Sequence, residues 1–223
     1  MTTGGQVVVE ALRVEGVRHV FGLIGSAGME IFDALHGEPS IRFIGVRDER
    51  TGTHMADGYA RASGAAGVML AGQNGPGATN LVTGLAQAQA AFSPVVALAG
   101  SLSSAHVYRD AFQEVDQAAL FRPVTKKTWL VPQASRIGEL TREAFRTATT
   151  PRCGPVVLNL PRDLLAATIE SASPVALRGR QADGPCAAHP ALIEHAAQLL
   201  AGAERPLILA GGGVKNGRHA QAT

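Results

Sequence analysis

The stretch that decides the fold is IRFIGVRDERTGTHMADGYARASG, residues 41–64. Its apolar start predicts a strand over Ile41–Val46, and after four charged residues a segment rich in small residues predicts a helix over Thr51–Ala62. The same succession of a short apolar run and a helical pattern recurs through most of the chain. Such alternation is typical of a parallel sheet that is covered by helices on both faces.

Six apolar runs are the predicted strands of this sheet. The run PVVALA, residues 94–99, contains no polar side chain and suits a strand that is buried on both faces. The sequence therefore predicts an α/β fold with an open, mostly parallel six-stranded sheet. The predicted strands are His19–Leu23, Ile41–Val46, Val68–Ala71, Pro94–Ala99, Thr128–Val131 and Pro155–Leu160, and the predicted helices are Gln6–Val17, Met29–Leu35, Thr51–Ala62, Gly77–Ala91 and Arg136–Thr147.

A change of composition predicts a domain boundary near residue 169. The segment ESASPVALRGRQADGPCAAH, residues 170–189, has no sustained period and is rich in Pro, Gly, Ala and Ser. We expect a first domain over 1–168, a linker over 169–189 and the start of a second α/β domain over 190–223. In that last part PALIEHAAQLLAGAE predicts a helix, and RPLILAGGGVKNG predicts a strand that runs into a glycine turn. One helix and one strand are too little to bury their own apolar faces, so we expect this domain to be truncated.

Composition narrows the class of protein. The 223 residues carry a net charge of +2 without a dense run of Lys or Arg, which argues against a nucleic-acid partner and an anionic membrane surface. The two cysteines, Cys153 and Cys186, show no metal-ligand spacing. The start of the chain lacks the pattern of an export signal, and no apolar run approaches the length of a membrane span. We expect a cytoplasmic protein with no metal site of its own.

Two polar segments directly follow predicted strands. Ligands of open parallel sheets bind beyond the carboxyl ends of the strands, so Glu49 is a candidate functional residue; the alternative is a solvated ion pair with Arg47 or Arg50. The second segment, AGQNGPGATN (residues 71–80), matches neither the Walker loop nor the dinucleotide fingerprint. Its Gly75-Pro76-Gly77 turn permits close backbone approach to a flat ring, with the Asn80 amide one helical turn further on. The alternative is a simple strand-to-helix connection.

Four ordered motifs resemble a known family. They are RDERTGTHMADGYARASG, GPGATN, DAFQEVD (residues 110–116) and the Thr125-Lys126 pair. Together they look like the N-terminal pyrimidine-binding domain of thiamine diphosphate enzymes of the acetolactate synthase group, over about residues 5–165. The resemblance implies that Glu49 hydrogen-bonds a ring nitrogen of the aminopyrimidine. This bond favours the imino tautomer that takes the proton from the thiazolium carbon.

The resemblance assigns roles to further residues. It implies that Gly75, Pro76 and Asn80 line the pyrimidine and that Gln113 reaches the active centre near the reacting carbon. It aligns Arg152 with an arginine that contacts FAD in acetolactate synthases, and it suggests Phe112 and Lys126 for the substrate entrance. Core packing and a solvated amine are the alternatives for this last pair.

One motif of the family is absent from the chain. The resemblance implies that the diphosphate and its Mg²⁺ are held through a Gly-Asp-Gly followed later by an Asn, and no Gly-Asp-Gly occurs here. We therefore expect the metal ligands on a missing domain or a partner, so that the chain supplies half of a site and is inactive alone. The partner is expected to be a second copy in a homo-oligomer or a complementary subunit.

The expected reaction is thiamine diphosphate-dependent decarboxylation and carboligation of a 2-oxo acid, with pyruvate as the donor. Two turns depart from the acetolactate synthase pattern: FGLIGSAG (residues 21–28) lacks a proline, and AGQNGPG stands where ATSGPG is common. Both resemble the sulfoacetaldehyde acetyltransferase branch, which is one alternative. A non-catalytic truncated relative that acts as a dimerising interaction protein is the other.

Overall fold

The structure is a computed structural model that describes residues 2–169 and 188–212. The chain divides into two compact units, residues 1–177 and 178–223. Most of the predicted linker, 169–189, lies outside the described residues.

The first unit contains the predicted six-stranded sheet, and every pair of neighbouring strands in it is parallel. Its strand order is β3-β2-β4-β5-β7-β6. The chain leaves β2 in one direction to form β3 and returns on the other side to form β4, which creates a topological switch point between β2 and β4. Ligands of open α/β sheets bind at such points. The strands are β2 (His19–Gly22), β3 (Arg42–Gly45), β4 (Gly67–Ala71), β5 (Val95–Ser101), β6 (Lys127–Leu130) and β7 (Val156–Pro161).

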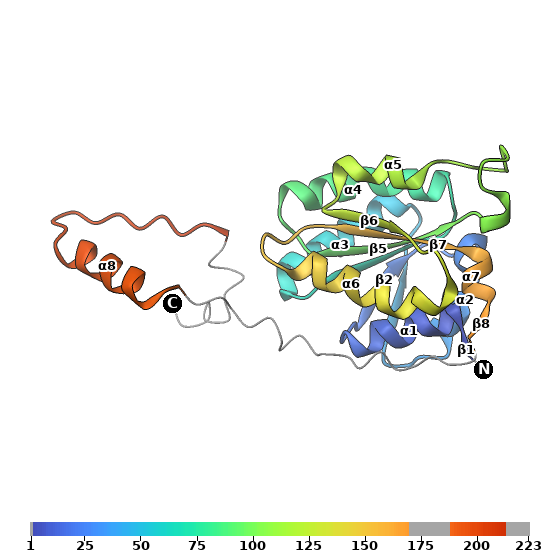
Figure 1. The fold of residues 1–223 in the computed structure, drawn as a ribbon, viewed down its shortest axis with the longest axis horizontal. Helices are drawn as coiled ribbons and strands as arrows, with labels where there is room; N and C mark the ends of the chain where they lie inside the picture. The colour runs from blue at the N-terminus through green and yellow to red at the C-terminus, as the bar shows by residue number, and fades with distance from the viewer. Residues whose placement is uncertain (1, 170–187, 213–223) are drawn as a thin grey trace. The chain divides into compact units, whose positions relative to one another are not determined.

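Helices cover both faces of this sheet, as predicted (Figure 1). Helices α1, α2, α6 and α7 pack on one face, and α3, α4 and α5 pack on the other. Their bounds are α1 (Gly4–Val14), α2 (Met29–His36), α3 (Glu49–Ser63), α4 (Pro76–Ala90), α5 (Gln117–Phe121), α6 (Ile137–Thr149) and α7 (Arg162–Ala166), with short 3₁₀ turns at Ser26–Gly28, Ser104–His106, Arg122–Val124 and Ala134–Arg136.

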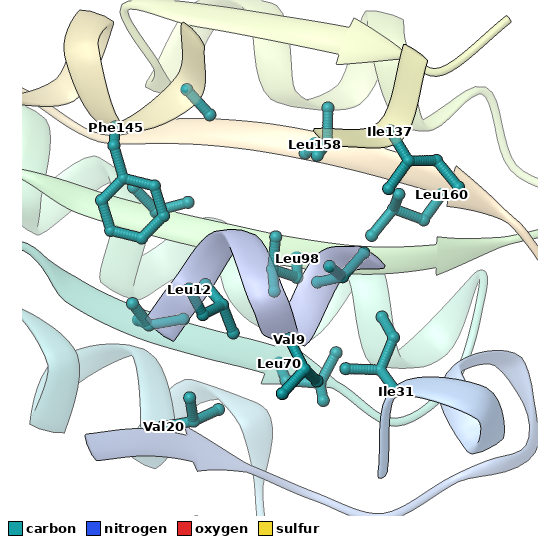
Figure 2. Close-up of a cluster of buried hydrophobic side chains, with 14 of the residues drawn as sticks. Val9, Leu12, Val20, Ile31, Leu70, Leu98, Ile137, Phe145, Leu158 and Leu160 are labelled. Atoms are coloured by element: carbon teal, nitrogen blue, oxygen red, sulfur yellow. The ribbon is translucent and has the colours of Figure 1, made fainter. Parts of the chain in front are cut away.

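Alternating side chains of each strand divide the core into two clusters. Val96 and Leu98 of β5 face α1 and α6, whereas Val95, Ala97 and Ala99 face α4. Figure 2 shows the first cluster, in which side chains of α1 meet side chains of the central strands. All seven residues of β5 are buried, which confirms the prediction from the PVVALA run.

Helix α3 begins two residues earlier than predicted, and this places the candidate carboxylate inside it. Asp48 is the N-cap residue, and its side chain accepts a hydrogen bond from the backbone nitrogen of Arg50 at 2.8 Å. Glu49 is consequently the first helical residue. Gly64, with φ of 70°, ends the helix in the left-handed conformation that glycine adopts readily.

A small antiparallel pair that no sequence pattern indicated is formed by β1 (Thr2–Thr3) and β8 (Thr168–Ile169). It joins the two ends of the first unit. Thr3 also caps α1, because its side chain accepts from the backbone nitrogen of Gln6 while the Gln6 side chain accepts from the Thr3 nitrogen.

The second unit confirms its predicted helix, α8 (Pro190–Ala201), but not its strand. Residues 206–211 of RPLILAGGG form no strand, and Leu207 and Leu209 are 93% and 95% exposed. Since a strand needs a neighbour for its backbone hydrogen bonds, a segment without one has no reason to be a strand.

Candidate active site

Glu49 lies just beyond the carboxyl end of β3 and is almost fully buried, with 4% of its surface exposed. The Asn80 Nδ2 donates a hydrogen bond of 3.0 Å to its Oε2, while the Thr53 hydroxyl donates to its backbone oxygen. Within the described parts of the chain, no side chain donates a hydrogen bond to Oε1. The carboxylate is therefore withdrawn from water with one of its two oxygens free to accept from a ligand.

The alternative for Glu49, a solvated ion pair with Arg47 or Arg50, is wrong. Arg50 pairs with Asp48 instead, with Nη2 and Oδ2 2.7 Å apart, and this pairing holds the pKa of Asp48 below its ordinary value. No Lys or Arg in residues 2–169 and 188–212 forms an ion pair with Glu49. Burying a carboxylate costs free energy that one amide donor offsets only in part, which is common at functional sites.

The turn after β4 contains three predicted residues, of which Asn80 contacts Glu49. Gly75 has φ of +55° and precedes Pro76, the first residue of α4, while Asn80 lies one helical turn further along. A Cβ on Gly77 would lie 2.9 Å from the Glu49 Oε1, closer than normal contact, so the missing side chain keeps that oxygen open. The turn is thus more than a strand-to-helix connection, because it shapes the surroundings of the carboxylate.

Gln113 comes from the long segment after β5 and lies against the same turn. A Cβ on Gly75 would lie only 2.3 Å from the Gln113 backbone oxygen. The Gln73 Nε2 donates to the Gln113 Oε1 at 2.8 Å, and the Asn74 Nδ2 donates to the Gln113 backbone oxygen at 3.1 Å. The structure therefore brings Glu49, Gly75, Asn80 and Gln113 together at one edge of the sheet.

A pocket of about 550 Å³ adjoins Gln113 at the carboxyl ends of β5, β6 and β7. Its walls include Ser101, Leu130 and Asn159 from the strand ends. The Ser101 Oγ and the Asn159 Oδ1 are buried and have no hydrogen-bond partner in the described structure. A ligand at Gln113 would thus have room beside it.

Arg152 and Lys126 lie before the amino ends of the strands, whereas Glu49 lies beyond the carboxyl ends. Both precede the strands that follow them, β7 and β6, and the Arg152 guanidinium stacks on Phe92 with its carbon 4.0 Å from the ring centroid. The Lys126 Nζ donates to the backbone oxygens of Thr147 and Thr150 at 2.6 and 3.0 Å, at the end of α6. Lys126 therefore lies away from Glu49, whereas Phe112 is 80% exposed beside Gln113.

Neither a metal-binding cluster nor a membrane span occurs among the described residues. No group of three or more His, Cys, Asp or Glu side chains in this part of the chain could hold a metal ion. None of the helices described is both long and apolar enough to cross a membrane.

Residues that the sequence did not single out complete the site. Gln73, Asn74 and Ser26 hold the candidate residues, and the Ser26 hydroxyl donates to the Gln73 Oε1 at 2.8 Å. Both turns that contain them depart from the family pattern. This departure was the only sign in the sequence that Ser26, Gln73 and Asn74 belong to the site. No sequence pattern showed that the two turns are in contact.

A buried carboxylate at the carboxyl ends of the strands, faced by a glycine turn and an asparagine, is the kind of site that α/β ligand-binding domains have at their switch point. Comparison with known proteins identifies the family of this domain. The family described as "Thiamine pyrophosphate enzyme, N-terminal TPP binding domain" matches residues 2–120, and the chain belongs to this family.

Relatives extend the likeness beyond that domain. The chain is 43% identical over 216 residues to a probable acetolactate synthase large subunit of Methanocaldococcus jannaschii, a match that covers 95% of this chain and 36% of the relative. It is 40% identical over 224 residues to the acetolactate synthase isozyme 3 large subunit of Escherichia coli, covering 99% of this chain and 39% of the relative. The chain thus spans little more than a third of the length of these relatives.

Proposed function

We propose that this chain supplies the pyrimidine-binding half of an acetolactate synthase-like active site, which decarboxylates a 2-oxo acid such as pyruvate and joins the product to an acceptor. The observation that carries the proposal is the buried Glu49 carboxylate with its open Oε1. Its position after a strand of a thiamine pyrophosphate enzyme domain agrees with the role that the sequence resemblance implies.

The residues present fit thiamine diphosphate. Glu49 would accept a hydrogen bond from the aminopyrimidine through Oε1, the oxygen to which Asn80 does not donate. Asn80 fixes the other carboxylate oxygen, and Gly75 and Pro76 would form the wall beside the ring. Thiamine diphosphate supplies the nucleophilic carbon and the electron sink of the reaction.

The chain's own residues would control a proton and exclude water. Asn80 donates only to Oε2, so the proton that Glu49 shares would lie on Oε1. The low exposure of Glu49 strengthens this interaction, since water does not compete for the carboxylate. Gln113, held beside the same turn, would face the substrate.

Other components would come from elsewhere. We propose that Mg²⁺ and the diphosphate bind to a further domain or to a partner, either a second copy of the protein or a complementary subunit, and that the chain alone has no turnover. FAD binding at Arg152 is part of the proposal: the guanidinium is exposed and already stacks on Phe92.

The test is the exchange of the thiazolium C2 proton for deuterium, followed by NMR. The chain is assembled with a candidate subunit that carries the diphosphate-binding residues, and Glu49→Gln is compared with the wild type. We expect at least a hundredfold slower exchange in the variant, about what loss of general acid-base catalysis costs.

The matched control is Glu139→Gln, which removes a half-exposed carboxylate of α6 that pairs with Arg136. It should exchange at the wild-type rate. Wild-type exchange in Glu49→Gln would refute the role of Glu49, and failure of thiamine diphosphate to bind under any condition would favour the non-catalytic interaction protein.

The sulfoacetaldehyde acetyltransferase-like reaction is the second candidate, favoured by the two departing turns. In the structure these turns are in contact through Ser26 and Gln73. Phosphate as the required acceptor, with acetyl phosphate as product, would distinguish this reaction from carboligation.

A further inference from the structure

A chain of hydrogen bonds crosses the switch point of the sheet. The Ser26 hydroxyl, in the turn after β2, donates to the Gln73 Oε1 at 2.8 Å. Gln73, in the turn after β4, donates through Nε2 to the Gln113 Oε1, also at 2.8 Å. Three segments distant in sequence are thus connected side chain to side chain.

Glycines bring these segments into contact. A Cβ on Gly25 would lie 2.0 Å from the Gly72 oxygen, and a Cβ on Gly72 would lie 2.2 Å from the Leu23 oxygen. Any larger residue at either position would separate the two turns. The close approach places Ser26 and Gln73 within hydrogen-bonding distance.

The backbone of Gln113 is fixed independently of its side chain. Its φ of +61° is rare for a residue other than glycine, and the Asn74 side chain donates to its carbonyl oxygen. On the adjacent residue, the Glu114 carboxylate accepts from the backbone nitrogens of Tyr108 and Ala111 at 2.6 and 2.9 Å. What remains to be set is the orientation of the Gln113 amide.

Gln73 sets that orientation. A glutamine amide has one oxygen that accepts and one NH₂ group that donates. In the structure the Gln73 oxygen accepts from the Ser26 hydroxyl, and the Gln73 NH₂ donates to the Gln113 oxygen. The Gln113 NH₂ has no acceptor among the described residues and is left for a ligand.

We propose that Gln73, hydrogen-bonded to Ser26, is a positioning residue that makes Gln113 a hydrogen-bond donor toward an anionic oxygen of the substrate, the carboxylate of a 2-oxo acid. The identity of the substrate class rests on the proposed function, whereas the orientation of the amide rests on the structure alone. The pair consists of residues from the two departing turns, so it is a feature of this chain rather than of the family's usual pattern.

The first experiment measures the side-chain amides by NMR in the ¹⁵N-labelled chain without any ligand. In the wild type we expect a Gln73 NH₂ proton shifted downfield and exchanging slowly, and Gln113 NH₂ protons exchanging at the rate of free amides. The carboxylate of the Gln73→Glu variant can only accept hydrogen bonds, so Gln113 must turn its NH₂ toward residue 73. The Gln113 NH₂ protons should then exchange at least tenfold more slowly than in the wild type.

The matched control is Gln133→Glu, which adds the same charge at an exposed position with no side-chain hydrogen bond shown. It should leave the Gln113 resonances unchanged. A protected Gln113 NH₂ in the wild type, or Gln113 resonances that do not respond to Gln73→Glu, would overturn the proposal.

The second experiment uses the assembled enzyme. Gln73→Glu should raise the KM for the 2-oxo acid by about ten- to a hundredfold, the range for loss of a hydrogen bond to a charged group. Gln73→Met, which has no amide to orient Gln113, should show an intermediate KM, and Ser26→Ala a smaller rise.

An equal fall of kcat and proton exchange without a change of KM would assign Gln73 a merely structural role. Absence of turnover with every 2-oxo acid would refute the proposed function, while the NMR measurement would still decide the orientation of the amide.

Discussion

Gly77→Ala separates the stability of the domain from the function of its site. The new Cβ would lie 2.9 Å from the Glu49 Oε1 and 3.3 Å from the Gln73 Cβ. Normal contact begins at 3.4 Å, so the oxygen must move by about 0.5 Å, the limit within which a binding constellation keeps its geometry. The far end of the Glu49 side chain can make this movement without disturbing the backbone.

The expected result combines a stable fold with weakened binding. Alanine is favoured over glycine in a helix by about 0.5–1 kcal/mol, which offsets the local crowding, so we expect the free energy of unfolding to change by less than about 1 kcal/mol. A hydrogen bond to a charged group contributes about 1.5–3 kcal/mol, so loss of about half of it corresponds to roughly a tenfold loss of affinity for the pyrimidine.

The assay uses the part of the cofactor that this chain would bind. The aminopyrimidine fragment of thiamine is titrated into the labelled chain, and the resonances of Asn80 and of the residue at position 77 are followed by NMR; urea unfolding gives the stability. Gly58→Ala is the control, because nothing lies within 4 Å of its new Cβ on the same helix as Glu49. Unchanged affinity in a folded Gly77→Ala variant would refute the reasoning.

Two further predictions concern the core and the segment that carries Gln113. Leu158 is fully buried in β7, so Leu158→Ala should lower the free energy of unfolding in urea by about 2–5 kcal/mol, and a loss below about 1 kcal/mol would contradict the packing in Figure 2. Backbone donors at Ala111 and Tyr108 hold the pKa of Glu114 below its ordinary value. The stabilisation that these hydrogen bonds give the folded segment is therefore complete above the pKa of Glu114 in the unfolded chain. It is lost as pH falls through the lower pKa of Glu114 in the folded chain. Exchange of the Tyr108 amide, corrected for intrinsic rates, should accelerate on acidification below about pH 4 and should lose this dependence in Glu114→Gln.

The sheet was predictable because its signals are local. Each strand is a short apolar run that ends at a polar or glycine turn, and all six predicted runs overlap an observed strand. The predicted strand at residues 206–211 was wrong, since pairing depends on a neighbour that sequence periodicity does not reveal. The β1–β8 pair was missed because two-residue strands are too short for any period.

The candidate site was predictable only in part. The position of Glu49 after a strand was visible in the sequence. That its hydrogen-bond partner is Asn80 and not an arginine depends on the packing of α3 against α4, which the sequence does not show. Gln73 and Ser26 lie 47 residues apart, and no local pattern predicts their hydrogen bond. The segment rich in small residues predicted a helix from Thr51, whereas in the structure Asp48 is the N-cap residue and Glu49 is the first helical residue.

The parallel arrangement of the strands also separates two sets of charges. Glu49 lies beyond the carboxyl ends and Arg152 before the amino ends, and seven residues of β5 at about 3.3 Å each put roughly 23 Å between those edges. The Debye length is about 8 Å at physiological ionic strength. Because Glu49 is buried, salt screens it from Arg152 only in part, but at roughly 23 Å two unit charges interact by only about 0.7 kcal/mol at an effective dielectric constant of 20. Any stronger influence between ligands at the two ends of the strands would have to travel through the packing of the sheet.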